Sequence, residues 1–168
     1  MSKFFLTLHV LVAVLAVGPV TVAASLFPRS VRNSLNGCSN RAPEARLLHR
    51  LTRVYATVGA AVPLLGIATA AAMGVTKDPW VIASLTLTAI AAGLLITRVL
   101  PGQQEALAML NEDGRRAAAA TDVPAATDTA QEPAALLKQL SMTTGIFSLL
   151  WAVVLVLMVV RPGSSTGG

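Results

Sequence analysis

An apolar run without Asp, Glu, Lys or Arg decides the fold of this chain: FFLTLHVLVAVLAVGPVTVAASL, residues 4–26. A helix needs about 20 mostly apolar residues to cross the ~30 Å hydrocarbon core of a bilayer. A segment in lipid must also satisfy its own backbone hydrogen bonds, which a helix does. The run therefore predicts a transmembrane helix. If it were a cleaved signal peptide, three spans would remain, but a signal h-region is shorter, at about 7–15 residues.

Three more stretches have the same character, at residues 54–75, 80–100 and 142–160, and only Arg98 in the second of these is charged. Hydrophobic residues make up 54% of the 168 residues and charged residues 12%, whereas about a quarter of a soluble domain is charged. We therefore predict an all-α, polytopic membrane protein. It would be a four-transmembrane-helix bundle that forms a single membrane domain over residues 1–168.

The distribution of basic residues orients the predicted bundle. One side of the membrane would carry Lys3, Lys77 and Arg161. The other side would carry Arg29, Arg32, Arg41, Arg46, Arg50, Arg53, Arg98, Arg115, Arg116 and Lys138. Because the side richer in Lys and Arg faces the cytoplasm, we predict a multi-pass protein of the cell inner (plasma) membrane with both termini outside. The net charge of +5 follows from this bias, so we expect no nucleic-acid partner.

Two predicted loops would lie in the cytoplasm. Residues 27–53 form a basic loop with a helical run leading into the second span, and its arginines are expected to contact anionic lipid or an acidic partner surface. These arginines are Arg29, Arg32, Arg41, Arg46, Arg50 and Arg53. Residues 101–139 form a second loop with a short polar helix at 103–116 and a mobile low-complexity part at 117–133. Residues 162–168 are predicted as a disordered tail.

Small residues recur at helical spacing in the second and third spans. Such stripes let helix backbones approach closely, so we expect these two spans to pack tightly on each other or on a partner. The residues expected to make this packing are Gly59, Pro63, Gly66, Ala70, Ala89 and Gly93. Pro19 and Pro63 lie inside spans and are expected to kink them.

The ionisable residues give no support for catalysis. All eight acidic residues lie outside the predicted spans, whereas ion-coupled carriers usually hold a carboxylate near the midplane. One cysteine and two histidines cannot make a four-ligand zinc site without carboxylates. Neither GxSxG nor HExxH occurs in the chain. We therefore expect no enzyme, no catalytic residue, no metal site and no cofactor.

His9 and His49 are the remaining candidates for cofactor binding, as axial ligands of a haem. His9 lies near the outer end of the first span and His49 at the opposite end of the second. At about 1.5 Å per residue, roughly 25–30 Å of depth separates them, so one haem cannot bind both within a single chain. A haem at a subunit interface would use one of them. The simpler interpretation is a neutral interior His9 near Ser84 and Thr86, and an interfacial His49.

Three stretches of the chain resemble a known family. They are LHVLVAVLAVGPVTVAASLFPR at 8–29, LHRLTRVYATVGAAVPLLG at 48–66 and TGIFSLLWAVVLVLMVVRPG at 144–163. They are similar to the DUF2269 group of predicted integral membrane proteins, notably its actinobacterial members. The resemblance implies a four-helix inner-membrane protein with a histidine early in the first helix, and it implies no activity.

Three functions are compatible with this sequence. The leading hypothesis is a non-catalytic membrane protein that packs against partner subunits in the lipid bilayer, for instance an accessory or assembly subunit of a respiratory complex. The first alternative is a small haem-binding or redox protein that uses His9 or His49. The second is an oligomeric small-solute transporter or channel. Its polar path would be lined by Thr7, Thr21, Thr57, Thr69, Ser84, Thr86 and Thr88.

Overall fold

The computed structural model describes residues 2–36, 42–119 and 131–162, and within these ranges every regular element is a helix. The elements are α1 (Ser2–Leu35), α2 (Ala42–Gly59), α3 (Ala61–Met73), α4 (Pro79–Leu94), the π-helical turn η2 (Leu95–Val99), α5 (Leu100–Ala119) and α6 (Gln131–Val160). Four helical stretches are long and apolar enough to cross a membrane. The expected all-α fold with four such helices is therefore confirmed.

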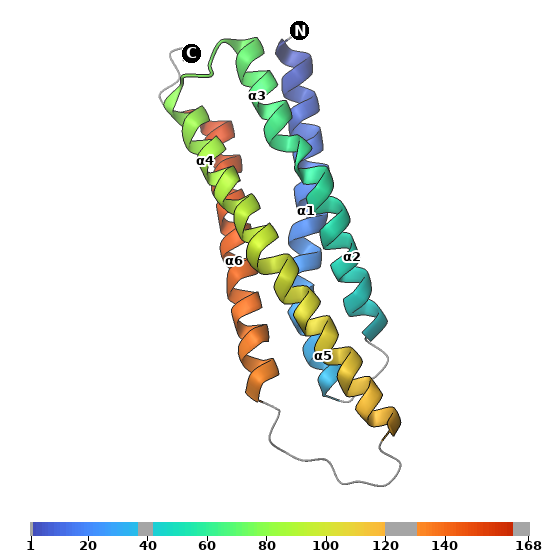
Figure 1. The fold of residues 1–168 in the computed structure, drawn as a ribbon. Coiled ribbons are helices and arrows are strands. Elements are labelled where there is room, and N and C mark those ends of the chain that lie inside the picture. The colour runs from blue at the N-terminus through green and yellow to red at the C-terminus, as the bar shows by residue number, and fades with distance from the viewer. Residues whose placement is uncertain (1, 37–41, 120–130, 163–168) are drawn as a thin grey trace.

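The four long helical stretches (α1, α2–α3, α4–η2–α5 and α6) form an elongated bundle in which successive stretches run in opposite directions (Figure 1). We call the end where α1 begins and α6 ends the terminal end, and the opposite end the distal end. At the terminal end, residues 74–78 connect α3 to α4. Gly74 ends α3 with a φ of 71°, in the left-handed region that glycine adopts without strain. The Val75 N–H then donates to the Ala70 carbonyl at 3.0 Å.

Two of the long helices are interrupted next to a proline. A proline ring clashes with the carbonyl four residues earlier, and for Pro63 that carbonyl belongs to Gly59, where α2 ends. Pro101 stands in the same relation to Thr97, which lies in η2. The break before Pro63 matches the expected kink. The first helix, in contrast, continues as a helix through both Pro19 and Pro28.

The helices extend well beyond the predicted spans, so the two predicted loops are largely helical. α1 continues to Leu35 and α2 begins at Ala42, which makes most of residues 27–53 helix. The stretch Pro79–Arg116 has 38 residues, or about 57 Å at ~1.5 Å per residue. Residues 101–119 and 131–139 are helix as well. Of the predicted mobile part, residues 120–130 lie outside the described residues, as do 163–168 of the predicted tail.

Two clusters of buried side chains hold the bundle together. The central core comprises Ala13, Ala16, Val20, Ala24, Val62, Ala91, Leu95, Val99, Phe147, Trp151 and Val154. The distal core comprises Ala23, Phe27, Val31, Ala45, Leu48, Ala106, Leu137 and Leu140. The distal-core residues recur every three or four positions along α1, α2 and α6. Each of these helices therefore presents an apolar stripe to its neighbours. The distal core explains why the helices continue through residues that sequence analysis had assigned to loops.

The second and third spans diverge toward the terminal end, so they do not pack tightly on each other there, which was one of the two expected arrangements. Packing on a partner stays a prediction. α3 packs mainly on α1, and α4 packs mainly on α6. Ala89 is exposed on α4, and a Cβ added at Gly93 would meet no atom within 4 Å. Small residues permit a close approach of two helices but do not enforce one.

Candidate functional site

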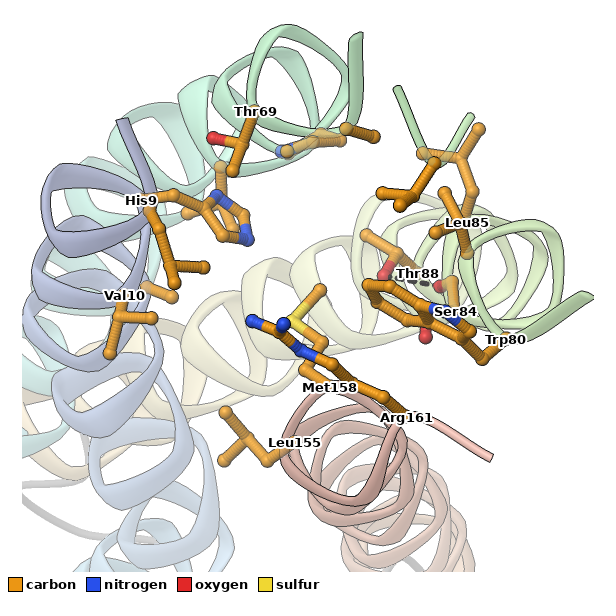
Figure 2. A pocket seen from close by; sticks show the side chains of 18 of the residues that line it. His9, Val10, Thr69, Trp80, Ser84, Leu85, Thr88, Leu155, Met158 and Arg161 are labelled. Carbon is orange, nitrogen blue, oxygen red and sulfur yellow. Dashed lines mark hydrogen bonds between the residues drawn. The ribbon is translucent and has the colours of Figure 1, made fainter. Parts of the chain in front are cut away.

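A cavity of about 460 Å³ lies where the two helix pairs separate, at the terminal end of the bundle. Its walls come from α1, α3, α4 and α6, and most of them are aliphatic or aromatic. Figure 2 looks into this cavity, with His9 on one side and Ser84, Thr88 and Trp80 on the other. Its polar lining residues are His9, Thr69, Ser84, Thr88 and Arg161. A mainly apolar pocket with a few polar groups is the usual form of a small-molecule site.

His9 reaches the cavity from α1 across a glycine of α3. His9 is 4% exposed, and its ring is hydrogen-bonded to the backbone of Val62. A Cβ added at Gly66 would be 3.1 Å from the Cε1 of His9, closer than ordinary van der Waals contact. Gly66 therefore provides the space that the imidazole occupies. Sequence analysis expected Gly66 to pack against another helix, and what it packs against is the side chain of His9.

Two polar atoms at this cavity have no hydrogen-bond partner in the described part of the chain. They are the Nδ1 of His9 and the Oγ of Ser84, and Ser84 is only 3% exposed. The nearby Thr88 and Thr69 hydroxyls instead donate to the backbone carbonyls of Ser84 and Leu65, at 2.8 and 2.7 Å. Buried polar atoms are nearly always hydrogen-bonded, so these two atoms, on residues that line the cavity, have unused hydrogen-bonding capacity.

The mouth of the cavity carries a cation. The Cζ of Arg161 lies 5.7 Å from the ring centroid of Trp80, and its guanidinium extends over the cavity in Figure 2. The Trp80 Nε1 donates to the Asp78 Oδ2 at 3.1 Å, which fixes the indole. Sequence analysis counted Arg161 only as a charge on one side of the membrane. Trp80 and Arg161 stand at the ends of two predicted spans on the same side of the membrane, and this placement was the feature of the sequence that could have indicated their proximity.

A smaller cavity of about 90 Å³ continues the first along the bundle, and the two share Pro63 and Thr88 as lining residues. Its far walls include Tyr55, Phe147 and Trp151. Beyond it, the distal core fills the space between the helices. The bundle is thus hollow toward its terminal end and packed toward its distal end.

A buried polar network crosses the distal core. The Oε1 of Gln103 lies 3.0 Å from the Nδ1 of His49, and because an amide oxygen only accepts, Nδ1 is the donor. The Gln103 Nε2 donates to the Thr52 Oγ1 at 3.5 Å, and this hydroxyl donates to the Leu48 carbonyl at 2.9 Å. The network joins α2 to α5. Sequence analysis placed Gln103 at the start of a short polar helix and did not single it out as a buried residue.

His9 and His49 therefore lie in different parts of the bundle. His9 lines the cavity at the terminal end, whereas His49 bonds to Gln103 and packs with its ring centroid 6.5 Å from that of Phe27 in the distal core. This separation confirms that one haem cannot bind both histidines within a chain. In the described ranges, no three or more His, Cys, Asp or Glu side chains lie close enough together to hold a metal ion.

The predicted contact arginines lie on helices at the distal end. Arg29, Arg32, Arg46, Arg50 and Arg53 are exposed, and Arg41 lies outside the described residues. The Arg46 Nη2 donates to the Asn111 Oδ1 at 2.6 Å, which adds a surface contact between α2 and α5. What the other four arginines contact stays a prediction.

The remaining small residues have different surroundings. Pro63 and Ala70 line the larger cavity beside Gly66. Gly59 lines the smaller cavity, and a Cβ there would meet nothing within 4 Å. The closest glycine packing is at Gly102, which was not predicted: a Cβ there would overlap the Cδ1 of Leu140 on α6.

No family model, no curated protein and no solved structure matches this chain. The resemblance to the DUF2269 group therefore stays a prediction. The function has to be argued from the geometry of the cavity and from the distribution of charge.

Proposed function

We propose that this protein is a non-catalytic membrane protein that binds a small, largely apolar molecule in the cavity at the terminal end. One observation carries the proposal: two buried polar atoms without partners, the His9 Nδ1 and the Ser84 Oγ, adjoin a cavity of about 460 Å³. An unsatisfied buried polar atom costs about 1–3 kcal/mol. A ligand with a polar group would remove this cost and would fill the apolar remainder of the cavity.

Binding accounts for the geometry better than passage of a solute across the bundle. Of the polar residues expected to line a path, Thr69, Ser84 and Thr88 line the cavity. The side chains of Thr7, Thr57 and Thr86 are exposed on the outside of the bundle. The apolar distal core closes the opposite end. A site that is open at one end and packed at the other favours a bound ligand.

The ligand can be identified by extraction of the native protein. Protein purified from native membranes in a mild detergent is expected to carry one organic molecule, detectable by mass spectrometry of a solvent extract. In Gly66→Leu, the added side chain meets His9 and enters the cavity, so this molecule should be lost. Gly18→Leu is the matched control, because a Cβ at Gly18 meets nothing within 4 Å. Equal ligand content in wild type and Gly66→Leu, or a haem absorbance band that accounts for the bound molecule, would contradict the proposal.

We further propose that the distal end faces the cytoplasm, with both termini outside an inner (plasma) membrane. The exposed arginines of α1 and α2 support this orientation, because Lys and Arg are enriched on the cytoplasmic side. In a Cys38→Ser background, a cysteine at Ala118 is expected to resist an impermeant thiol reagent in intact cells, and a cysteine at Ser164 is expected to react. The reverse labelling pattern would invert the topology.

A second candidate function is association with a partner membrane subunit, as in an accessory or assembly subunit of a larger complex. The observation that favours it is the small-residue face of α4, where Ala89 is exposed and Gly93 has open space around it. Small residues allow close helix approach in a bilayer, and in the described part of the chain a Cβ at Gly93 would meet no atom within 4 Å. Ala89→Leu is expected to release a co-purified subunit, whereas Ala152→Leu on the exposed face of α6 should retain it. Retention by both variants would remove this candidate.

A further inference from the structure

We infer that the molecule held in the cavity is an anionic amphiphile, with a carboxylate or phosphate head at Arg161 and a hydrocarbon chain inside the bundle. This inference rests on the proposed function and specifies its ligand class. It follows from three features of the cavity: the sign of its charge, the depth of its free polar atoms and the position of its opening.

The first feature is an uncompensated positive charge. Arg161 is the charged member of the lining, and no carboxylate accompanies it among the described lining residues. Asp78, whose Oδ2 accepts from the Trp80 Nε1, keeps its negative charge near the mouth but does not line the cavity. An arginine fork binds carboxylate and phosphate oxygens in a bidentate manner. Beside apolar walls the attraction is also stronger than in water. The mouth therefore selects an anion.

The second feature is the depth of the unpartnered atoms. Ser84 follows Trp80 by four residues, or about 6 Å along α4, so its Oγ lies roughly one turn below the mouth. His9 faces the same space from α1 (Figure 2). The Ser84 hydroxyl can donate a hydrogen bond, whereas the free Nδ1 of a neutral His9, whose other ring nitrogen donates to the Val62 backbone, accepts one. Head-group oxygens that contact Arg161 can thus accept from the Ser84 hydroxyl, and a head group that also carries an O–H can donate to the His9 Nδ1.

The third feature is the route by which a hydrocarbon chain can enter. Val10 on α1 and Leu155 and Val159 on α6 line the cavity and are also exposed on the outside of the bundle. The cavity is therefore bordered by side chains that face the surrounding lipid. An amphiphile already in the membrane can insert its chain from the side while its head stays at the Arg161 level.

Trp80 provides a direct test, because it lines the cavity and is one of only two tryptophans. The experiment uses the full chain carrying Trp151→Phe, purified in detergent, so that Trp80 is the sole fluorophore. Dibromostearic acid is expected to quench Trp80 saturably, whereas the matched dibromostearyl alcohol should bind at least about tenfold more weakly. In separate arms, brominated phosphatidylglycerol and brominated phosphatidylcholine distinguish a lipid head group from a free fatty acid as the anion source.

Variants at the mouth assign the effect to Arg161. Arg161→Gln is expected to weaken quenching by the acid about tenfold, corresponding to about 1.4 kcal/mol, and Arg161→Lys should weaken it less. The matched control is Lys77→Gln, because Lys77 is exposed at the same end and does not line the cavity. Each variant is compared with its own unquenched fluorescence, since Arg161 lies over the Trp80 ring.

The outcomes separate this inference from the proposed function. If acid and alcohol quench equally and Arg161→Gln has no effect, the ligand is apolar but not anionic, and this inference is overturned while the proposed function stands. If neither compound quenches saturably, and extracted native protein carries no bound molecule, both are overturned. Preference for the free acid or for phosphatidylglycerol supports the inference in either case and identifies the source of the head group.

Discussion

Replacing Gln103 by alanine is expected to lower the free energy of unfolding by about 2–4 kcal/mol. The side chain is fully buried, its Oε1 lies 3.0 Å from the His49 Nδ1, and its Nε2 donates to Thr52. Truncation would leave the Thr52 hydroxyl and the His49 ring without their shared partner. It would also open a void in the distal core between α2 and α5.

Equilibrium unfolding in mixed micelles with increasing SDS, followed by circular dichroism, measures this loss. Gln104→Ala is the matched control, because Gln104 is the next residue of α5 and is exposed. This variant is expected to stay within about 0.5 kcal/mol of wild type. A loss in Gln104→Ala as large as that in Gln103→Ala would show that the helix itself, and not the buried network, is sensitive to substitution.

The second large effect is expected at Gly102. Alanine normally stabilises a helix interior by about 1 kcal/mol relative to glycine. At Gly102, however, the new Cβ would overlap the Cδ1 of Leu140, and Leu140 is itself buried in the distal core. We expect overpacking to make Gly102→Ala less stable than wild type by about 1–3 kcal/mol. The same SDS titration measures the change.

The control for this substitution lies on the same helix. Gly114→Ala changes the same atoms in α5, but a Cβ there meets nothing within 4 Å, so it should be neutral or stabilising. Shortening the partner should relieve the clash: in a Leu140→Ala background, Gly102→Ala is expected to cost less than it does alone. If the two substitutions were additive, contact between Gly102 and Leu140 would not be the cause.

The contrast between the predicted and observed ends of the third span shows how far sequence reasoning reached. The apolar run stops at Leu100, so hydropathy predicted that the span ends there and that a separate short helix follows at 103–116 within a loop. The helix continues because Gly102, Gln103 and Ala106 face Leu137 and Leu140 of α6 and the polar groups of α2. Spacing of three or four residues was visible in the sequence. Its meaning depended on which helices would lie opposite.

The cavity shows the same limit. His9 was recognised as unusual because it stands in an apolar run, and Gly66 was recognised as a packing residue. The two residues meet because α3 packs on α1. The spacing of small residues had suggested instead that the second span packs on the third. Arg161 was counted only as a charge on one side of the membrane, and its place over Trp80 requires α4 and α6 to end side by side.

The sequence by itself determined four helices that are able to cross a bilayer and an uneven distribution of basic residues. Both are properties of short stretches, because transfer of a segment into lipid depends mainly on its own length and side chains. Only the tertiary structure decided that α3 and α4 diverge, that a cavity forms between them and that two buried polar atoms adjoin it. These features arise from competition among helix faces for partners, and that competition depends on the shapes of surfaces built from residues far apart in the chain.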